Sequence, residues 1–137
     1  MQKTRVLGII PARWASTRFP GKPLHPISGR PMLEHCFERA RLYDKWDVLA
    51  VATCDAEIEA FARSKDYPVI MTADTHARAL DRVAEATGKC GTDISDDDII
   101  LCVQGDEPLL GPDVIEAVLG PIECDVTVGG TILAVPI

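Results

Sequence analysis

The sequence predicts an α/β protein with a Rossmann-like arrangement, in which helices cover both faces of a mostly parallel sheet. Apolar runs of strand length alternate along the chain with stretches of helical periodicity. The runs are apolar on both faces, which is typical of strands buried in a parallel sheet. With 137 residues, 47% of them hydrophobic, the chain is long enough for its own core, and we expect residues 1–137 to form a single domain.

The elements are expected in a regular alternating order. Pro31 suits the first turn of the first helix, and Asp55 is placed to be the N-cap of the second. The inward face of the first helix is predicted to hold Met32, Leu33, Cys36, Phe37 and Ala40, and that of the third Leu80, Val83, Ala84 and Thr87. The expected strands are 5–12, 47–54, 67–73, 97–106 and 125–137, and the expected helices are 31–44, 55–66, 78–88 and 111–122.

Positive charge gathers at the start of an acidic chain. The formal net charge is -7, yet residues 1–30 hold six basic side chains and no acidic one, while the rest of the chain holds 8 basic and 21 acidic side chains. This asymmetry indicates a local anion site, because the acidic chain as a whole would repel nucleic acid. We therefore expect no nucleic-acid partner.

The sequence also predicts a cytoplasmic protein without a membrane partner. No apolar run reaches 18 residues, and the chain passes from Met1 directly into a strand without the apolar stretch of a signal peptide. The five cysteines are odd in number and widely spaced, so they are expected to be reduced thiols, with Cys54 at a strand end.

The segments richest in chemistry come at the ends of strands, at 11–22, 72–82 and 103–108. Ligands of parallel sheets bind at the carboxyl ends of the strands, so we expect these segments to converge on an active site. The acidic run at 91–98 is expected to be a solvated loop.

The segment 9–24, "IIPARWASTRFPGKPL", has the composition of a polyphosphate-binding loop. Gly21 allows close backbone approach, while Arg13 and Lys22 supply a fork-shaped donor and a point charge. It is not a Walker loop, because Ser16 stands where that motif needs glycine and Pro23 where it needs Ser or Thr.

Asp106 is expected at the tip of the strand that ends in "VQGDEP". A carboxylate that faces a phosphate-binding loop would repel the ligand unless a cation lies between them. Mg²⁺ prefers such oxygen ligands, so the sequence predicts Mg²⁺ as cofactor with Asp106 as a ligand; the alternative is an Asp that caps the next turn.

The two motifs resemble a known family. "IIPARWASTRFPGKPL" is similar to the P-A-R-x-x-S-x-R-x-P-G-K-x-L signature of cytidylyltransferases that activate acidic sugars, and "VQGDEP" and "LAVPI" recur in the 3-deoxy-manno-octulosonate (KDO) cytidylyltransferases. The resemblance implies a nucleotidyltransferase fold, Mg²⁺, and CTP and CMP as ligands. It implies a nucleotide-binding set of Pro11, Ala12, Arg13, Ser16, Arg18, Lys22, His76, Arg82 and Gln104, with Arg13, Lys22 and Asp106 as catalytic residues.

The chain departs from the KDO enzymes in two places. The KDO enzymes carry an H-x-S-G-T-x-R segment, in which His76 and Arg82 match but Ser-Gly-Thr is replaced by Arg-Ala-Leu at 78–80. The KDO enzymes are also nearly twice as long as this chain. Any second metal ligand would come from elsewhere, with Glu107 and Asp125 as weak candidates.

These departures bear on the small anionic acceptor. The short form is similar to the N-terminal domain of bifunctional fosfomycin-pathway enzymes that join a cytidylyltransferase to a phosphoenolpyruvate mutase. The first hypothesis is therefore 2-hydroxyethylphosphonate as acceptor, bound by Arg78 and Asp106, with a possible fusion to a second catalytic domain. The alternatives are a truncated KDO cytidylyltransferase and a non-catalytic nucleotide-sensing domain.

Overall fold

A parallel sheet forms the centre of this computed structural model, which describes residues 5–14, 21–74, 79–89, 98–103 and 115. The strand order β5-β4-β1-β6 places β1 and β4 inside the sheet, and all three pairings are parallel. The strands are β1 (Val6–Pro11), β4 (Val48–Thr53), β5 (Val69–Met71) and β6 (Ile99–Cys102).

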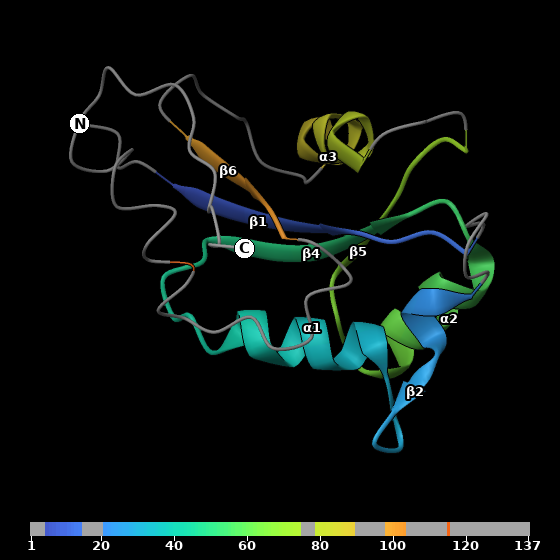
Figure 1. Cartoon of the computed structure of the whole chain (residues 1–137). Helices are drawn as coiled ribbons and strands as arrows, with labels where there is room; N and C mark the ends of the chain where they lie inside the picture. The colour runs from blue at the N-terminus through green and yellow to red at the C-terminus, as the bar shows by residue number, and fades with distance from the viewer. Residues whose placement is uncertain (1–4, 15–20, 75–78, 90–97, 104–114, 116–137) are drawn as a thin grey trace, which may run out of the picture.

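Helices cover both faces of the sheet, as expected (Figure 1). The helices α1 and α2 lie against one face and α3 against the other. Their bounds are α1 (Met32–Arg41), α2 (Ala56–Ser64) and α3 (Ala79–Gly88). The predicted α/β class is confirmed. Each described α-helix lies inside one of the ranges that the sequence periodicity predicts to be helical.

The apolar character of β1 on both faces has a direct structural reason. Ile10 packs into the core under α1 and α2, whereas its neighbour Ile9 packs with Val83 and Ala86 of α3 on the opposite face. All six residues of β1 are buried. Successive side chains of a strand point to opposite faces, so a strand between two helical layers needs apolar residues at every position.

The inward face of α1 agrees with the sequence prediction, whereas that of α3 agrees at Val83 and differs at Ala84. In α1 the buried residues are Leu33, Cys36, Phe37 and Ala40, with Met32 half-buried. In α3 the predicted inward residue Ala84 is exposed, while Arg82, Val83 and Ala86 are buried. Polar groups after β4 and β5 bond to Arg82, so the buried face of α3 includes a charged side chain as well as apolar ones.

Gly8 lets the chain between α1 and β4 pack closely on the middle of β1. A Cβ at Gly8 would lie 2.7 Å from the Trp46 ring, a distance that real Cβ atoms essentially never show. The indole N–H of Trp46 donates to the carbonyl of Ala40 over 2.8 Å. A glycine inside a strand often marks such a close approach.

A short hairpin before α1 was not foreseen from the sequence. The strand β2 (Pro26–Ile27) pairs antiparallel with β3 (Arg30–Pro31), after the 3-10 helix η1 (Lys22–Leu24). Ser28 and Gly29 form its turn with φ angles of 53° and 82°. Two consecutive positive φ values suit the tight turn that closes a hairpin.

Asp98 corrects the expectation that the whole run 91–98 is solvated. Its carboxylate is only 1% exposed and forms an ion pair with Arg5 over 2.7 Å. It also accepts the Arg5 backbone N–H, while Asp47 accepts the N–H of Val6. These bonds hold the starts of β1, β4 and β6 together.

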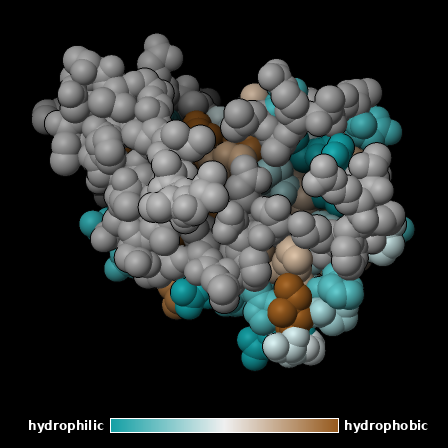
Figure 2. All heavy atoms as spheres, viewed as in Figure 1, coloured by the Kyte–Doolittle hydropathy of each residue, from teal (hydrophilic) through white to brown (hydrophobic). Residues whose placement is uncertain are grey.

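Two predicted elements lie largely or wholly outside the described residues. Of the predicted helix 111–122 the structure describes only Ile115, which is helical and buried, and the predicted strand 125–137 lies outside the described residues. In the described part of the face seen in Figure 2, hydrophobic surface shows only in small separate areas. Among the described residues, no helix combines the length and apolar character needed to cross a membrane.

Candidate functional site

The strand order reverses at β1, between the carboxyl ends of β1 and β6. From β1 the chain continues to β4 and β5 on one side, and only then crosses to β6 on the other side of β1. Such a reversal point is where open α/β sheets bind ligands. The last ladder bond there runs from the Val103 N–H to the carbonyl of Ile9 over 2.9 Å, directly before Gln104.

Arg13 is the first residue after β1 whose side chain reaches solvent. Pro11 ends the strand and is buried, and Ala12 is 5% exposed, with its N–H bonded to the carbonyl of Ala52 over 2.9 Å. Arg13 then stands exposed at the carboxyl edge. A guanidinium in this place can meet an anion without being buried.

The two residues that flank the segment 15–20 bond directly to each other. The N–H of Gly21 donates to the carbonyl of Trp14 over 2.8 Å. Gly21 has φ of +75°, and a Cβ there would lie 3.0 Å from the Trp14 ring. This supports the expectation that glycine at this position permits a close backbone approach, although against Trp14.

Asp55 connects the start of α2 to Trp14. The sequence predicts it as an N-cap, and it does occupy that position, but its side chain makes no capping hydrogen bond to the helix. Instead its Oδ2 accepts the backbone N–H of Trp14 over 2.6 Å, across 41 positions of sequence. The predicted N-cap position is therefore confirmed, and the side chain of Asp55 bonds outside its own helix.

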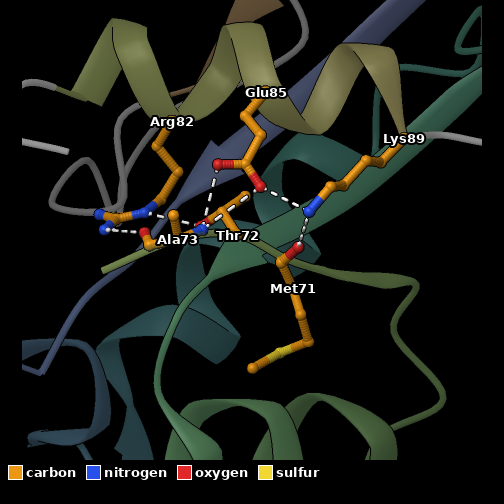
Figure 3. A network of polar contacts seen from close by, with 6 residues as sticks. All are labelled: Met71, Thr72, Ala73, Arg82, Glu85 and Lys89. Atoms are coloured by element: carbon orange, nitrogen blue, oxygen red, sulfur yellow. Dashed lines mark hydrogen bonds and ion pairs between the residues drawn. The ribbon is translucent and has the colours of Figure 1, made fainter. Parts of the chain in front are cut away.

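Arg82 links α3 to the carboxyl ends of two strands. Its Nε donates to the hydroxyl of Thr72 over 3.0 Å, and its Nη2 lies 3.5 Å from the Ala73 carbonyl, both after β5 (Figure 3). The same Nη2 lies 3.5 Å from the sulfur of Cys54, after β4. Arg82 is only 3% exposed. Its described bonds are to protein, and the contact with nucleotide that the resemblance implies stays a prediction.

Glu85 and Lys89 extend the same network along α3. Both carboxylate oxygens of Glu85 accept the Ala73 N–H, over 3.0 and 3.3 Å, and Lys89 bonds to Glu85 over 2.6 Å. Lys89 also reaches the carbonyl of Met71 over 3.4 Å. Figure 3 shows Arg82 and Glu85 of α3, and Lys89 directly after the helix, directed toward the end of β5 and the residues that follow it.

Cys54 lies between the arginine and the aspartate. It follows β4, as the sequence predicts for a strand end, and its sulfur is 3.8 Å from Asp55 Oδ2. Burial, followed by the nearby Asp55 carboxylate, raises the pKa of the Cys54 thiol. A protonated thiol can accept from Arg82 and donate to Asp55 at once.

Several predicted site residues lie outside the described part of the chain. Lys22 begins η1, and its side chain is not among those described. The described residues contain no group of three or more His, Cys, Asp or Glu that could hold a metal ion. The predicted residues outside the described ranges are Ser16, Arg18, His76, Arg78, Gln104, Asp106, Glu107 and Asp125.

The sequence prediction did not include Asp55, Thr72 or Cys54 in the site. A signal was available, since each lies in the last residues of a predicted strand or directly after it, at the edge where ligands of parallel sheets bind. The same rule that selected Arg13 and Asp106 would have selected these three.

Comparisons with known proteins agree on one family. Residues 7–125 match the family model described as cytidylyltransferase. A 3-deoxy-manno-octulosonate cytidylyltransferase of Nitratidesulfovibrio vulgaris (strain DP4) is 46% identical over 114 residues, which are 83% of this chain and 44% of that protein. An 8-amino-3,8-dideoxy-manno-octulosonate cytidylyltransferase of Shewanella sp. (strain W3-18-1) is 43% identical over 118 residues, or 86% of this chain and 47% of that protein.

Solved structures show the same similarity. A CMP:2-keto-3-deoxy-manno-octonic acid synthetase complexed with CTP is 34% identical with a TM-score of 0.83, over 91% of this chain and 50% of that chain. A 4-diphosphocytidyl-2C-methyl-D-erythritol synthase, 17% identical with a TM-score of 0.67 over 88% of this chain and 55% of that chain, shares the fold. The chain spans about half the length of these relatives.

Proposed function

Because this chain belongs to the cytidylyltransferase family, we propose that it binds CTP and transfers CMP to a small acidic acceptor with release of pyrophosphate. The observation that carries the proposal is the exposed Arg13 at the carboxyl end of β1, the strand at which the order of the sheet reverses. The solved relative named as a complex with CTP supports the choice of nucleotide.

The transfer is a direct displacement at the α-phosphorus. An acceptor oxygen forms a bond to this phosphorus, the bond to the bridging oxygen of the β-phosphate breaks, and pyrophosphate leaves with the bonding pair. A hydroxyl acceptor gives its proton to solvent, whereas an anionic acceptor oxygen has none to give. Positioning and charge neutralisation supply most of the catalysis in such transfers.

The basic residues of the first motif suit the nucleotide phosphates. Arg13 offers planar donors that can bond two phosphate oxygens at once, and Lys22 is proposed to add a point charge. The buried Arg82 is assigned to the edge itself, where it holds Thr72 and Ala73 in place. Binding of the nucleotide by Ser16, Arg18, His76 and Gln104 rests on the family motifs.

Mg²⁺ is part of the proposal. Asp106 follows β6 in the sequence, β6 pairs with the strand that leads to Arg13, and a carboxylate supplies the oxygen ligands that Mg²⁺ prefers. The cation, held by Asp106 and by phosphate oxygens, would neutralise charge on the triphosphate.

The acceptor proposed first is now a 3-deoxyoctulosonate sugar acid. The relatives 46% and 43% identical to this chain carry such acceptors in their names. The hypothesis of 2-hydroxyethylphosphonate stays a prediction, and one observation favours it: Arg78 stands where the KDO motif has a serine, and an arginine suits bidentate capture of a compact phosphonate. Fusion to a second catalytic domain likewise stays a prediction.

A pyrophosphate-release assay tests the function. The chain would be supplied with CTP, Mg²⁺ and, in turn, KDO, its 8-amino analogue, 2-hydroxyethylphosphonate or no acceptor. We expect release with a sugar acid and none in its absence, and release with the phosphonate alone would reverse the order of acceptors. The assay would be paired with calorimetry of CTP binding, and CTP bound without turnover on any acceptor would favour a nucleotide sensor.

The same assay tests the metal. Chelation with EDTA should stop release, and Mg²⁺ should restore it. Asp106→Asn is expected to abolish turnover while the circular dichroism spectrum stays that of the parent. Parent-level turnover in Asp106→Asn would remove this residue from the metal site.

A further inference from the structure

We propose that Asp55 is a positioning residue of the nucleotide site, which holds the Arg13–Trp14 backbone at the carboxyl edge of the sheet. The inference rests on the proposed function, because it assigns Asp55 to the site through Arg13. It begins from the bond of 2.6 Å between the Asp55 carboxylate and the Trp14 N–H.

The carboxylate of Asp55 is diverted from its ordinary local partner. An Asp at an N-cap normally accepts a backbone N–H of the first helical turn, which stabilises the helix by about 1 kcal/mol. Here it makes no such bond, although its backbone has the extended conformation of a cap, with φ of -106° and ψ of 130°. The Asp55 side chain instead accepts the N–H of Trp14, a residue that follows β1.

Asp55 is itself held from three sides. Its N–H donates to the Thr53 hydroxyl over 3.1 Å, and its carbonyl accepts the N–H of Glu59 over 3.0 Å, so its backbone is fixed between β4 and α2. Its carboxylate lies 3.8 Å from the sulfur of Cys54. An acceptor held in this way can determine the position of the N–H that donates to it.

The bonds form a continuous chain between α3 and the residues after β1, and Asp55 accepts from both sides of it. Arg82 donates to the Cys54 sulfur over 3.5 Å, the Cys54 thiol points its donor capacity at Asp55, and Trp14 donates to the same carboxylate oxygen. The raised pKa of Cys54 agrees with a thiol that keeps its proton for this bond. Residues after β1, β4 and β5 are thereby tied together at the edge where the nucleotide would bind.

The position of Trp14 determines that of both its neighbours. Arg13 precedes it directly, and Gly21 donates its N–H to the Trp14 carbonyl over 2.8 Å. Beyond the ladder bond of Ala12, the bond to Asp55 is the one that joins this backbone to β4 among the described residues. Loss of the Asp55 carboxylate should therefore release Arg13 together with Trp14 and Gly21, the two residues that flank the segment 15–20.

The charge of Asp55 argues for positioning rather than for a direct phosphate contact. A carboxylate repels a triphosphate, so its presence beside Arg13 needs a structural reason, which the N–H of Trp14 supplies. A metal ligand is the competing explanation. Asparagine at position 55 distinguishes the positioning role from the metal-ligand role. Its amide oxygen can accept the N–H of Trp14 but, being uncharged, binds Mg²⁺ poorly.

The test compares Asp55→Ala, Asp55→Asn and, as matched control, Glu57→Gln, which removes an exposed carboxylate from the first turn of the same helix. Each protein would be labelled with 5-fluorotryptophan. Fluorine NMR then reports Trp14 and Trp46 separately, and Trp46 serves as an internal measure of folding because it packs in the core.

In Asp55→Ala we expect the Trp14 resonance to move toward that of free 5-fluorotryptophan while the Trp46 resonance stays in place. The Kd for CTP, measured by calorimetry, should rise roughly ten-fold, as for the loss of one charge-assisted hydrogen bond. Asp55→Asn should keep the parent resonance and a Kd within about three-fold of the parent, and Glu57→Gln should match the parent in both.

Two outcomes would overturn the inference. One is an Asp55→Ala protein with the Trp14 resonance and the Kd of the parent. The other is an Asp55→Asn protein as impaired in CTP binding as Asp55→Ala, which would indicate a metal ligand. If Asp55→Ala does not fold, as judged by Trp46, Asp55→Ser replaces it, because serine can cap α2. A parent that does not bind CTP would refute the proposed function alone, since the Trp14 resonance tests the contact without any nucleotide.

Discussion

Gly21 carries two separate constraints at the base of the first motif. Its φ of +75° lies in the left-handed region, and the Trp14 ring occupies the space next to it. Gly29 in the β2–β3 turn has nearly the same backbone conformation, with φ of +82°, but nothing within 4 Å of the place where a Cβ would stand. A comparison of Gly21 with Gly29 therefore separates the effect of backbone strain from the effect of contact with the Trp14 ring.

Gly21→Ala and Gly29→Ala should each lower the free energy of unfolding by about 1–2 kcal/mol, the cost of a left-handed L-residue. Only Gly21→Ala should shift the emission or fluorine resonance of Trp14 and weaken CTP binding, because only there does the methyl group meet the indole. Urea denaturation and calorimetry measure the two effects. Equal responses of Trp14 in both variants would show that the contact with Gly21 is unimportant.

At the scale of elements, Tyr67 joins the end of α2 to α1. Its ring stacks on Phe37 with centroids 3.8 Å apart, and its hydroxyl donates to Glu38 over 2.9 Å. Burial, followed by the hydrogen bond to Glu38, raises the pKa of the Tyr67 phenol above its ordinary value of 10.0. The packing of the two helices is thereby linked to the neutral form of the phenol.

Stability should therefore fall at high pH. Below pH 10 the Tyr67 phenol is neutral in both the folded and the unfolded protein, so its contribution to stability is complete. Above pH 10 the phenol ionises first in the unfolded chain, and this contribution is lost as the pH rises toward the pKa of the folded protein. The free energy of unfolding, measured in urea between pH 9 and pH 11, should fall less in Tyr67→Phe than in the parent. An identical fall in both proteins would mean that Tyr67 does not contribute.

Arg82 performs a similar linking role for α3. We expect Arg82→Lys to lower the free energy of unfolding by about 2–4 kcal/mol. An ammonium cannot reproduce the forked donors that bond Thr72 and Ala73, and it would be buried without a full set of hydrogen-bond partners. Lys89→Gln, a change in the exposed part of the same network, should cost less than about 1 kcal/mol. Equal stability of Arg82→Lys and the parent would refute the assignment.

Over the whole molecule, the two ends of the sheet use carboxylates differently. At the amino end, Asp98 and Asp47 bond to Arg5 and Val6 and hold strand starts together. At the carboxyl end, Asp55 is the carboxylate that bonds to the residue after Arg13. Stability and nucleotide binding should therefore respond to different carboxylates.

Asp98→Asn tests this separation. It should lower the free energy of unfolding by about 2–3 kcal/mol, since Arg5 would lose the charge of a buried partner, yet leave the Kd for CTP unchanged at temperatures where the protein is folded. Asp44→Asn, an exposed carboxylate near the same end, is the control for charge alone. A Kd that rises in parallel with the loss of stability would contradict the separation.

Much of the fold was predictable because its signals are local. The burial of β1 on both faces and the inward stripe of α1 follow from periodicity within single segments. The motifs at 9–24 and 103–108 indicated the family that residues 7–125 match. The β2–β3 hairpin was missed although Ser28–Gly29 is a turn signal, because the flanking strands are only two residues long.

By itself, the sequence determined the alternation of strands and helices, the basic first motif and the family, because each is encoded in residues close together along the chain. Only the tertiary structure decided the partners of Asp55, Arg82 and Asp98. These residues bond across 41, 10 and 93 positions of sequence, and the same side chains could equally have capped a helix or faced solvent. The order of strands in the sheet brings their partners within reach, and that order depends on long-range packing that no local pattern contains.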